Sequence, residues 1–207
     1  MAKSVQMINA GLMKLDVNVT MRHYRNGQLV PIFQENNLAI FLMKRGWLSP
    51  HWINRPYASL ISPFLGYWAS EKDSRNLVVT AGKAAAASRL NGSGGEAAFT
   101  AIGQGIGTTS PAAGNTTLES ERTAAGGASA VHALPTASVT VSRVTTTVTS
   151  DTAQLVGTIT EAATLAITES GVFNADTAGT MLCRQTFSAV NVVSGDSLQF
   201  TWRIACA

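Results

Sequence analysis

The sequence predicts a mainly β protein whose C-terminal domain is an antiparallel β-sandwich of the jelly-roll or immunoglobulin-like kind. Only 13% of the 207 residues are charged, and glycine, alanine, serine and threonine are abundant, which is typical of sheets and turns rather than of solvated helices. The last third consists of short runs rich in β-branched residues, separated by turn residues. With 45% hydrophobic residues, the chain can bury one good core and a second small lobe.

Residues 1–75 differ in charge from residues 76–207, which indicates two parts. The first part holds nine Lys and Arg against four Asp and Glu, and the second holds six against eight, so the formal charges are +5 and −2. Residues 1–20 alternate loosely between apolar and polar positions, a pattern compatible with a strand or an extended arm. We predict an irregular, basic anchoring arm over 1–75 and a β-sandwich domain over 76–207.

The segment between residues 26 and 68 is rich in aromatic residues and carries four prolines, which prevent long regular elements. So many rings do not fit into a small core of their own. We expect them to pack on the β domain, on another subunit or in a partner's pockets, and favour a neighbouring protein over an intramolecular core of Trp and Tyr. The predicted docking residues are Arg22, Arg25, Phe33, Lys44, Arg45, Trp47, Trp52, Tyr57, Phe64, Tyr67 and Trp68.

Two short helices are expected. Residues 36–46 begin with an asparagine that can cap a helix, carry a basic pair that suits the C-terminal dipole, and end at Gly46. Residues 77–90 have the alanine content of a helix, and the glycine-rich run 91–95 stops it.

Strands are predicted mainly after residue 97. The candidate 98–103 runs into a long loop of small residues over 104–127. The last run alternates, with Leu198, Phe200, Trp202 and Ile204 on one face, as in a half-buried antiparallel strand. The strand candidates of the last third are 139–148, 155–159, 165–167, 181–182 and 197–204.

Two glycine motifs require a comparison with nucleotide-binding sites. Gly103, Gly105 and Gly107 follow a candidate strand, but a dinucleotide fingerprint needs its third glycine three residues after the second, followed by a helix. Lys83 lacks both the earlier glycine and the following Ser or Thr of a phosphate-binding loop. We therefore predict a strand that runs into a glycine-rich surface loop at residue 104, a solvated Lys83 and no cofactor.

The titratable residues do not form a recognisable catalytic or metal-binding pattern. His23, His51 and His132 are far apart and lack ligand spacing. Glu161 and Glu169 could be imagined as a general acid and base, but we interpret Glu169 as a solvated charge at a turn or bulge. The sequence also lacks a Gly-x-Ser-x-Gly elbow. We predict a protein that is not an enzyme and binds no metal.

The cysteine pattern and the N-terminus indicate synthesis in a cytoplasm. Cys183 and Cys206 form neither a disulfide framework nor a zinc motif, and we expect reduced thiols. Neither a signal peptide nor an apolar stretch of about 18 residues is present, so no membrane contact is expected. The basic residues of 1–75 are dispersed, which argues against nucleic acid and favours an acidic protein surface.

Residues 76–207 carry an ordered string of short motifs. The string resembles a β-rich family of virion structural proteins from tailed bacteriophages; each motif alone is weak, and residues 1–75 lie outside the resemblance. The motifs are Asn76-Leu77 with Gly82-Lys83, the run 101–109, Pro111-Ala112-Ala113, the set Thr116, Leu118 and Glu121, and the runs 167–174, 179–184 and 195–202.

The resemblance implies a virion protein of the fibre, neck, tail or capsid-decorating type, without enzymatic activity. Its partners would be portal or neck, tail or major capsid proteins, held by buried area. A fibre or spike would be a homo-oligomer, most simply a trimer, whereas a decoration protein could be a monomer. A receptor- or glycan-binding module and a cell-envelope hydrolase are the alternatives.

Overall fold

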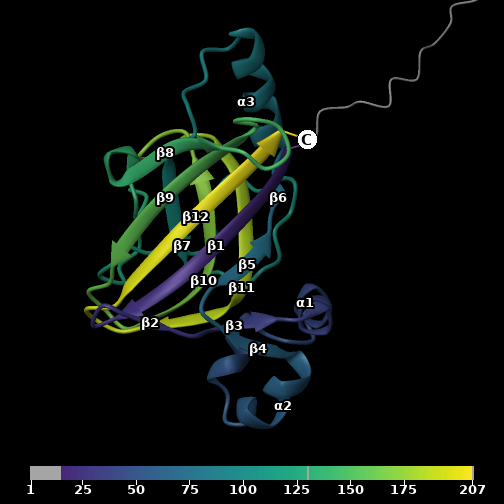
Figure 1. Ribbon diagram of the computed structural model, residues 1–207, viewed down its shortest axis with the longest axis vertical. Helices are drawn as coiled ribbons and strands as arrows, with labels where there is room; N and C mark the ends of the chain where they lie inside the picture. Colours follow the sequence, from purple (N-terminus) through teal and green to yellow (C-terminus); the bar gives the residue numbers. More distant parts are fainter. Residues whose placement is uncertain (1–14, 130, 207) are drawn as a thin grey trace, which may run out of the picture.

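Two antiparallel β-sheets pack face to face in the computed structural model, which describes residues 15–129 and 131–206 (Figure 1). The first sheet has the order β2–β1–β12–β9–β8 with β5 beside β1, and the second has the order β6–β11–β10–β7. The first sheet comprises β1 (Leu15–Arg25), β2 (Gln28–Val30), β5 (Lys72–Arg75), β8 (Val139–Val144), β9 (Thr152–Thr160) and β12 (Ser197–Cys206). The second comprises β6 (Leu77–Val78), β7 (Ala101–Gly105), β10 (Leu165–Phe173) and β11 (Met181–Val192).

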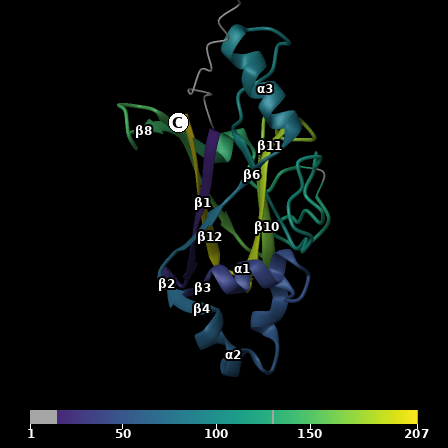
Figure 2. The same ribbon diagram turned by 90° about the vertical axis from the view of Figure 1, so that its right-hand side faces the viewer.

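The core lies between the two sheets, which Figure 2 shows edge-on. Val19 and Trp202 from the first sheet share one hydrophobic cluster with Val172 and Phe187 from the second, and all four are buried. The strands form because their alternation places an apolar face toward this layer. The predicted mainly β fold with an antiparallel sandwich is confirmed.

The pairing of β1 with β12 lies in the middle of the first sheet. The two strands are in register from Leu15↔Cys206 to Tyr24↔Ser197. In β12 the alternation predicted from the sequence is confirmed, because Leu198, Phe200, Trp202 and Ile204 are buried while the residues between them are not.

The predicted division at residue 75 is wrong for the described part of the N-terminal segment. Val17, Val19 and Met21 of β1 point into the sandwich core, so this stretch is a sheet strand and not part of an irregular arm. The proposed boundary also falls between β5, which pairs with β1, and β6, which pairs with β11. The chain at residues 72–78 thereby passes from one sheet to the other.

Residues 31–70 form a small lobe at one end of the sandwich (Figure 1). The antiparallel strands β3 (Ile32–Glu35) and β4 (Gly66–Ala69) bring its two ends together, and Asn36 N donates to Leu65 O at 2.8 Å. The chain between them forms α1 (Asn37–Lys44), the 3-10 helix η1 (Pro50–Asn54) and α2 (Ala58–Leu65).

The lobe helices are only partly those predicted. The predicted helix at 36–46 is confirmed as α1, with the Asn36 side chain accepting from Ala39 N at 3.0 Å and Gly46 in the left-handed region at φ +72°. The helix α2 was missed because Pro63, which lies inside it, favours a break.

One buried cluster ties the lobe to both sheets. Lys72 of β5 is fully buried and donates through Nζ to Phe33 O at 2.7 Å, to Ser188 Oγ of β11 at 2.9 Å, and to the carboxylate of Glu35 in β3. Glu35 in turn accepts from the backbone N–H of Ser188. Burial raises the pKa of Glu35, but the Lys72 ammonium and Ser188 outweigh it and hold this pKa below its ordinary value.

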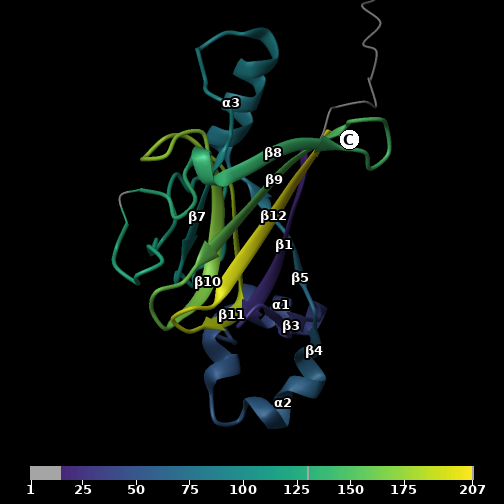
Figure 3. The same cartoon turned by 60° about the vertical axis from the view of Figure 1, so that its left-hand side comes forward.

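The helix α3 (Thr80–Asn91) stands at the opposite end from the lobe (Figure 1, Figure 3). It confirms the helix predicted at 77–90, except that residues 77 and 78 form β6. Gly82 is required there, because a Cβ atom would lie 2.2 Å from Leu182 O of β11. None of the helices in the described ranges is both long and apolar enough to cross a bilayer.

A chain that starts at residue 76 should not fold as an isolated sandwich. It would lack β1, so one edge of β12 would lose its ten-residue pairing, and Val17, Val19 and Met21 would leave the core. We expect no cooperative thermal transition followed by circular dichroism, in contrast to the full chain. A cooperative transition of the shortened chain would show that β1 is dispensable.

Candidate functional site

The structure divides the eleven predicted docking residues into three groups. Phe33 and Trp52 are buried inside the lobe, and Arg22 and Arg25 lie on β1 of the sandwich. The other seven are exposed on the lobe: Lys44, Arg45, Trp47, Tyr57, Phe64, Tyr67 and Trp68.

Phe33 and Trp52 are corrected from docking residues to core residues. Their rings meet edge to face with centroids 5.1 Å apart, and they are 2% and 0% exposed. They pack with Ala39, Ala58 and Leu65 into a core that belongs to the lobe alone. The segment thus encloses some of its rings in an intramolecular core, although the sequence favours a neighbouring protein.

Arg22 and Arg25 lie outside the lobe, and both have acidic partners within the chain. Arg22 Nη2 lies 2.8 Å from Glu71 Oε2. Arg25 donates through Nε and Nη2 to the two oxygens of Asp196 at 2.9 and 2.8 Å. Asp196 also contacts His23 Nε2 at 2.7 Å, so this group fixes the turn between β11 and β12 against β1.

The helix α2 has two apolar faces. Ala58, half-buried Ile61 and Leu65 face the lobe core, at helical spacing. Leu60 and Phe64, one turn apart, are 74% and 72% exposed. The helix carries no charge, and its two polar residues, Ser59 and Ser62, lie by spacing on a third side. The exposed apolar face formed by Leu60 and Phe64 is therefore suited to contact with a partner.

A second exposed apolar area lies on and just after α1. The rings of Phe41 and Trp47 meet edge to face with centroids 6.2 Å apart, and Trp47 is 73% exposed. The guanidinium carbon of Arg45 lies 5.4 Å from the centroid of the Phe41 ring, within cation–π range. Exposed Leu38 lies on the same side of the helix by spacing.

The exposed charges of the lobe all have one sign. Glu35 is the only acidic residue between 31 and 70, and it is buried against Lys72. Lys44, Arg45 and Arg55 are exposed, and none of the three has an ion pair among the described residues. The lobe therefore presents a surface that is both apolar and positive.

The exposed aromatic rings are concentrated in this lobe. Every strongly exposed aromatic side chain in the described ranges belongs to it, namely Phe41, Trp47, Tyr57, Phe64, Tyr67 and Trp68. By contrast, the outer face of the first sheet carries cross-strand polar pairs such as Thr20↔Thr201 and Asn18↔Arg203. Large exposed apolar patches mark contact surfaces, and we define the exposed rings together with Leu38 and Leu60 as the docking surface.

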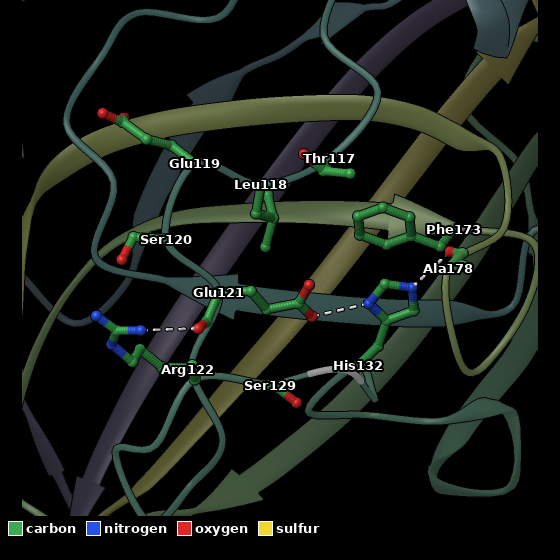
Figure 4. A pocket seen from close by; sticks show the side chains of 11 residues that line it. Thr117, Leu118, Glu119, Ser120, Glu121, Arg122, Ser129, His132, Phe173 and Ala178 are labelled. Carbon is green, nitrogen blue, oxygen red and sulfur yellow. Dashed lines mark hydrogen bonds and ion pairs between the residues drawn. The ribbon is translucent and has the colours of Figure 1, made fainter.

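A pocket of about 500 Å³ lies elsewhere, beside the loop that follows β7 (Figure 4). His132 Nδ1 lies 2.8 Å from Glu121 Oε1, its Nε2 lies 3.0 Å from Ala178 O, and its ring stacks on Phe173. Burial lowers the pKa of His132, but these hydrogen bonds outweigh it and raise this pKa. With both ring nitrogens engaged, His132 has no free nitrogen to activate a nucleophile.

Glu169 is not a solvated charge, and this interpretation is corrected. It is fully buried in β10, where Gly107 N and Ser120 N donate to Oε1 at 3.0 and 2.7 Å. Glu119 N and the guanidinium of buried Arg184 donate to Oε2 at 3.1 and 2.8 Å. Glu169 thereby fastens the long loop after β7 to the second sheet.

The prediction that the loop begins at residue 104 and lies at the surface is wrong for the glycine motif, because Gly105 belongs to the buried strand β7 and Gly107 is buried against Glu169. A Cβ atom at Gly105 or Gly107 would lie 2.5 or 2.4 Å from Glu169 Oε1. These glycines are therefore needed to admit the carboxylate, which is a packing role rather than a nucleotide-binding one. The sequence shows the run of glycines next to a strand. The carboxylate that they accommodate belongs to Glu169, which lies more than sixty residues away along the chain.

Glu161 is also buried, but its carboxylate has fewer hydrogen-bond partners than that of Glu169. Gln104 Nε2 donates to its Oε1 at 2.9 Å, while its Oε2 has no hydrogen-bond partner among the described residues. Burial raises the pKa of Glu161 to about 7, and the nearby Asp196 adds to this shift. Neither glutamate lies open to a substrate, since they are 1% and 0% exposed.

The remaining reactive groups offer no further centre within the described residues. Cys183 is buried and burial raises the pKa of its thiol, while Cys206 is exposed; both are free. No group of three His, Cys, Asp or Glu side chains in the described ranges is placed to hold a metal ion. Comparison with protein-family models, curated proteins and solved structures gave no match.

Replacing Glu169 by Gln should destabilise the fold by about 3–5 kcal/mol, because buried Arg184 would lose its buried counter-ion and keep only the more exposed carboxylate of Glu119, 3.3 Å away. Chemical denaturation measures this loss, and faster hydrogen exchange at the Gly107 and Ser120 amides would locate it in the loop. The exposed Asp16→Asn variant is the control and should lie within about 0.5 kcal/mol of the wild type. A Glu169→Gln variant as stable as this control would contradict the assigned role.

Replacing Glu161 by Gln should stabilise the protein in a pH-dependent way. The pKa of Glu161 in the folded protein, about 7, lies above its ordinary value of 4.5. The contribution of protonated Glu161 to the free energy of unfolding is therefore complete below pH 4.5 and is lost as the pH rises through 7. The variant should gain about 2–3 kcal/mol over the wild type at pH 8 and little at pH 4. Urea denaturation at both pH values tests this, and an equal difference at both would contradict it.

Proposed function

We propose that this protein is a structural component of a tailed-bacteriophage virion that docks on another particle protein through its lobe. The observation that carries the docking role is the outer face of α2, where Leu60 and Phe64 are largely exposed on a helix that carries no charge. The assignment to a virion is supported by the ordered motifs of residues 76–207, which resemble those of tailed-phage structural proteins. The chain would be made in the host cytoplasm and incorporated during assembly.

The energetics favour a docking role for this surface. Fully burying one large apolar side chain contributes about 1.5–3 kcal/mol, so the exposed side chains of Trp47, Leu60 and Phe64 together can offset much of the cost of association. Trp, Tyr and Arg are also the residues that dominate protein interfaces. A rigid cluster of such residues can hold the protein in a particle without any catalysis.

The partner follows from the charges of the lobe. Lys44, Arg45 and Arg55 favour an acidic surface around an apolar pocket, as expected of a portal, neck, tail or major capsid protein with such a patch. We place a fibre- or neck-associated role first and capsid decoration second. The same surface would serve either role. A host-receptor or glycan-binding role is weaker, because the rings that line the 500 Å³ pocket, His132 and Phe173, are buried.

Substituting Trp47, Leu60 and Phe64 together by Ser should leave the fold intact but remove the chain from particles. All three side chains are more than 70% exposed, so little folding energy is lost, whereas each hot-spot truncation costs about 2 kcal/mol of binding. The matched control is Leu90→Ser with Val148→Ser, which are also strongly exposed but lie outside the lobe. Copies of each variant per purified particle are counted by quantitative mass spectrometry.

Two outcomes would overturn the proposal. If the lobe variant enters particles as well as the control, the lobe is not the docking surface. If the wild-type chain is absent from purified particles and from cryo-electron microscopy maps of them, the virion role itself is wrong. Density for the lobe between other subunits at the neck or tail, or repeated over the capsid lattice, would distinguish the two placements.

A further inference from the structure

We propose that the groove between the lobe and the sandwich binds an extended polypeptide segment, which adds to the outer edge of β5 and places an acidic side chain near Lys44 and Arg75. The inference rests on the proposed function, because the segment would belong to the docking partner. The groove has a volume of about 830 Å³. One wall comes from β3 and α1 of the lobe, and the other from β5, β6, β11 and the loop at 108–111.

The position of β5 leaves one of its edges facing away from the sheet. Asn76 N donates to Val17 O at 2.9 Å, and Arg75 is opposite Asn18 in the register with β1. Because antiparallel residues alternate between hydrogen-bonded and non-hydrogen-bonded pairs, the backbone groups of Arg75 and Asp73 point away from β1. Figure 3 shows β5 at this side of the sandwich, above the lobe.

The outer edge of β5 already pairs with an amide group. The Gln34 side chain donates through Nε2 to Asp73 O at 3.0 Å and accepts from Asp73 N at 2.9 Å. These are the two hydrogen bonds that a residue of a neighbouring strand would make. Two residues farther along, the outward backbone N–H and C=O of Arg75 have no partner among the described residues and lie in the wall of the groove. An extended backbone is the group that fits them.

The side chains of the groove indicate what the segment carries. Lys44 and Arg75 are exposed and lack an ion pair within the described ranges, Glu35 is neutralised by Lys72, and Asp73 contributes one negative charge against these two positive ones. The groove is therefore net positive and suits Asp or Glu in the segment. Ile40 and Leu77, both partly exposed in its walls, suit a neighbouring apolar residue.

A polypeptide fits this groove better than a nucleic acid strand does. Strands of nucleic acid are held by exposed stacking rings and several phosphate-binding cations. The one aromatic ring in the groove wall, Phe187, is only 2% exposed, and two cations are free. The unpaired backbone N–H and C=O of Arg75, in contrast, match the hydrogen-bonding groups of another extended backbone.

The test uses the immobilised full chain and two soluble hexapeptide libraries, both acetylated and amidated. One library has Asp or Glu at a fixed position among Val, Leu, Ile and Thr, and the other has Lys there. We expect the chain to retain members of the acidic library at least tenfold above the Lys library, measured by mass spectrometry of eluted peptides. Equal retention, or none from either library, would overturn the inference.

Two substitutions at one position separate the backbone contribution from the charge. Arg75→Gln removes the charge and keeps the outward N–H, whereas Arg75→Pro removes both, and proline is tolerated on an edge strand where the N–H faces outward. We expect Gln to lose the preference for acidic peptides and Pro to lose binding to both libraries. Both variants should show the same thermal transition. If the folded Pro variant binds as well as the Gln variant, no strand is added there.

The outcome is separable from that of the docking proposal. The variant with Ser at positions 47, 60 and 64 leaves the groove intact, so it should bind peptides like the wild type. If peptides bind but this variant still enters particles, the docking surface is wrong and the groove stands. If the libraries fail while this variant is excluded from particles, the groove inference alone is overturned.

Discussion

The buried contact between Lys72 and Glu35 is the constraint on which the arrangement of this protein depends. Lys72 comes from the first sheet, Glu35 from the lobe, and Ser188, which bonds to both, from the second sheet. Three units of the fold therefore meet at one polar centre that is closed to water. Removing a single member would leave a buried charge or donor uncompensated, at a cost of about 3–5 kcal/mol for an ion pair. Such a centre favours one orientation of the lobe over all others.

This fixed orientation separates the sandwich from a lobe that exposes its aromatic rings. The sandwich buries its apolar residues between its sheets and presents residues such as Thr20 and Thr201 to water. The lobe has too little chain to bury all of its rings, so Phe33 and Trp52 form its core while Trp47 and Phe64 remain outside. A rigid display of exposed rings loses little conformational freedom on binding, which is the condition for a strong contact.

The sequence predicted those helices and strands that are marked by patterns of a few residues. It missed the features that depend on residues far apart in the chain. The alternation around Phe200 and Trp202 predicted β12, and Asn36 with Gly46 predicted α1, because each signal is complete within a few residues. The burial of Glu169 depends on Gly107 and Ser120, which no short window can bring together. For the docking surface, composition identified the exposed lobe rings but could not tell them from the rings of its core.

The helix α1 connects the docking surface to the groove. Its residues divide by helical spacing into three faces: Ala39, Leu42 and Met43 toward the lobe core, Asn37, Ile40 and Lys44 toward the groove, and Leu38, Phe41 and Arg45 outward. A partner that covers the outward face is thus within one helix diameter of the groove, about 10 Å. A segment extending from that partner would enter the groove at a high effective concentration, so that two weak contacts could act as one strong attachment.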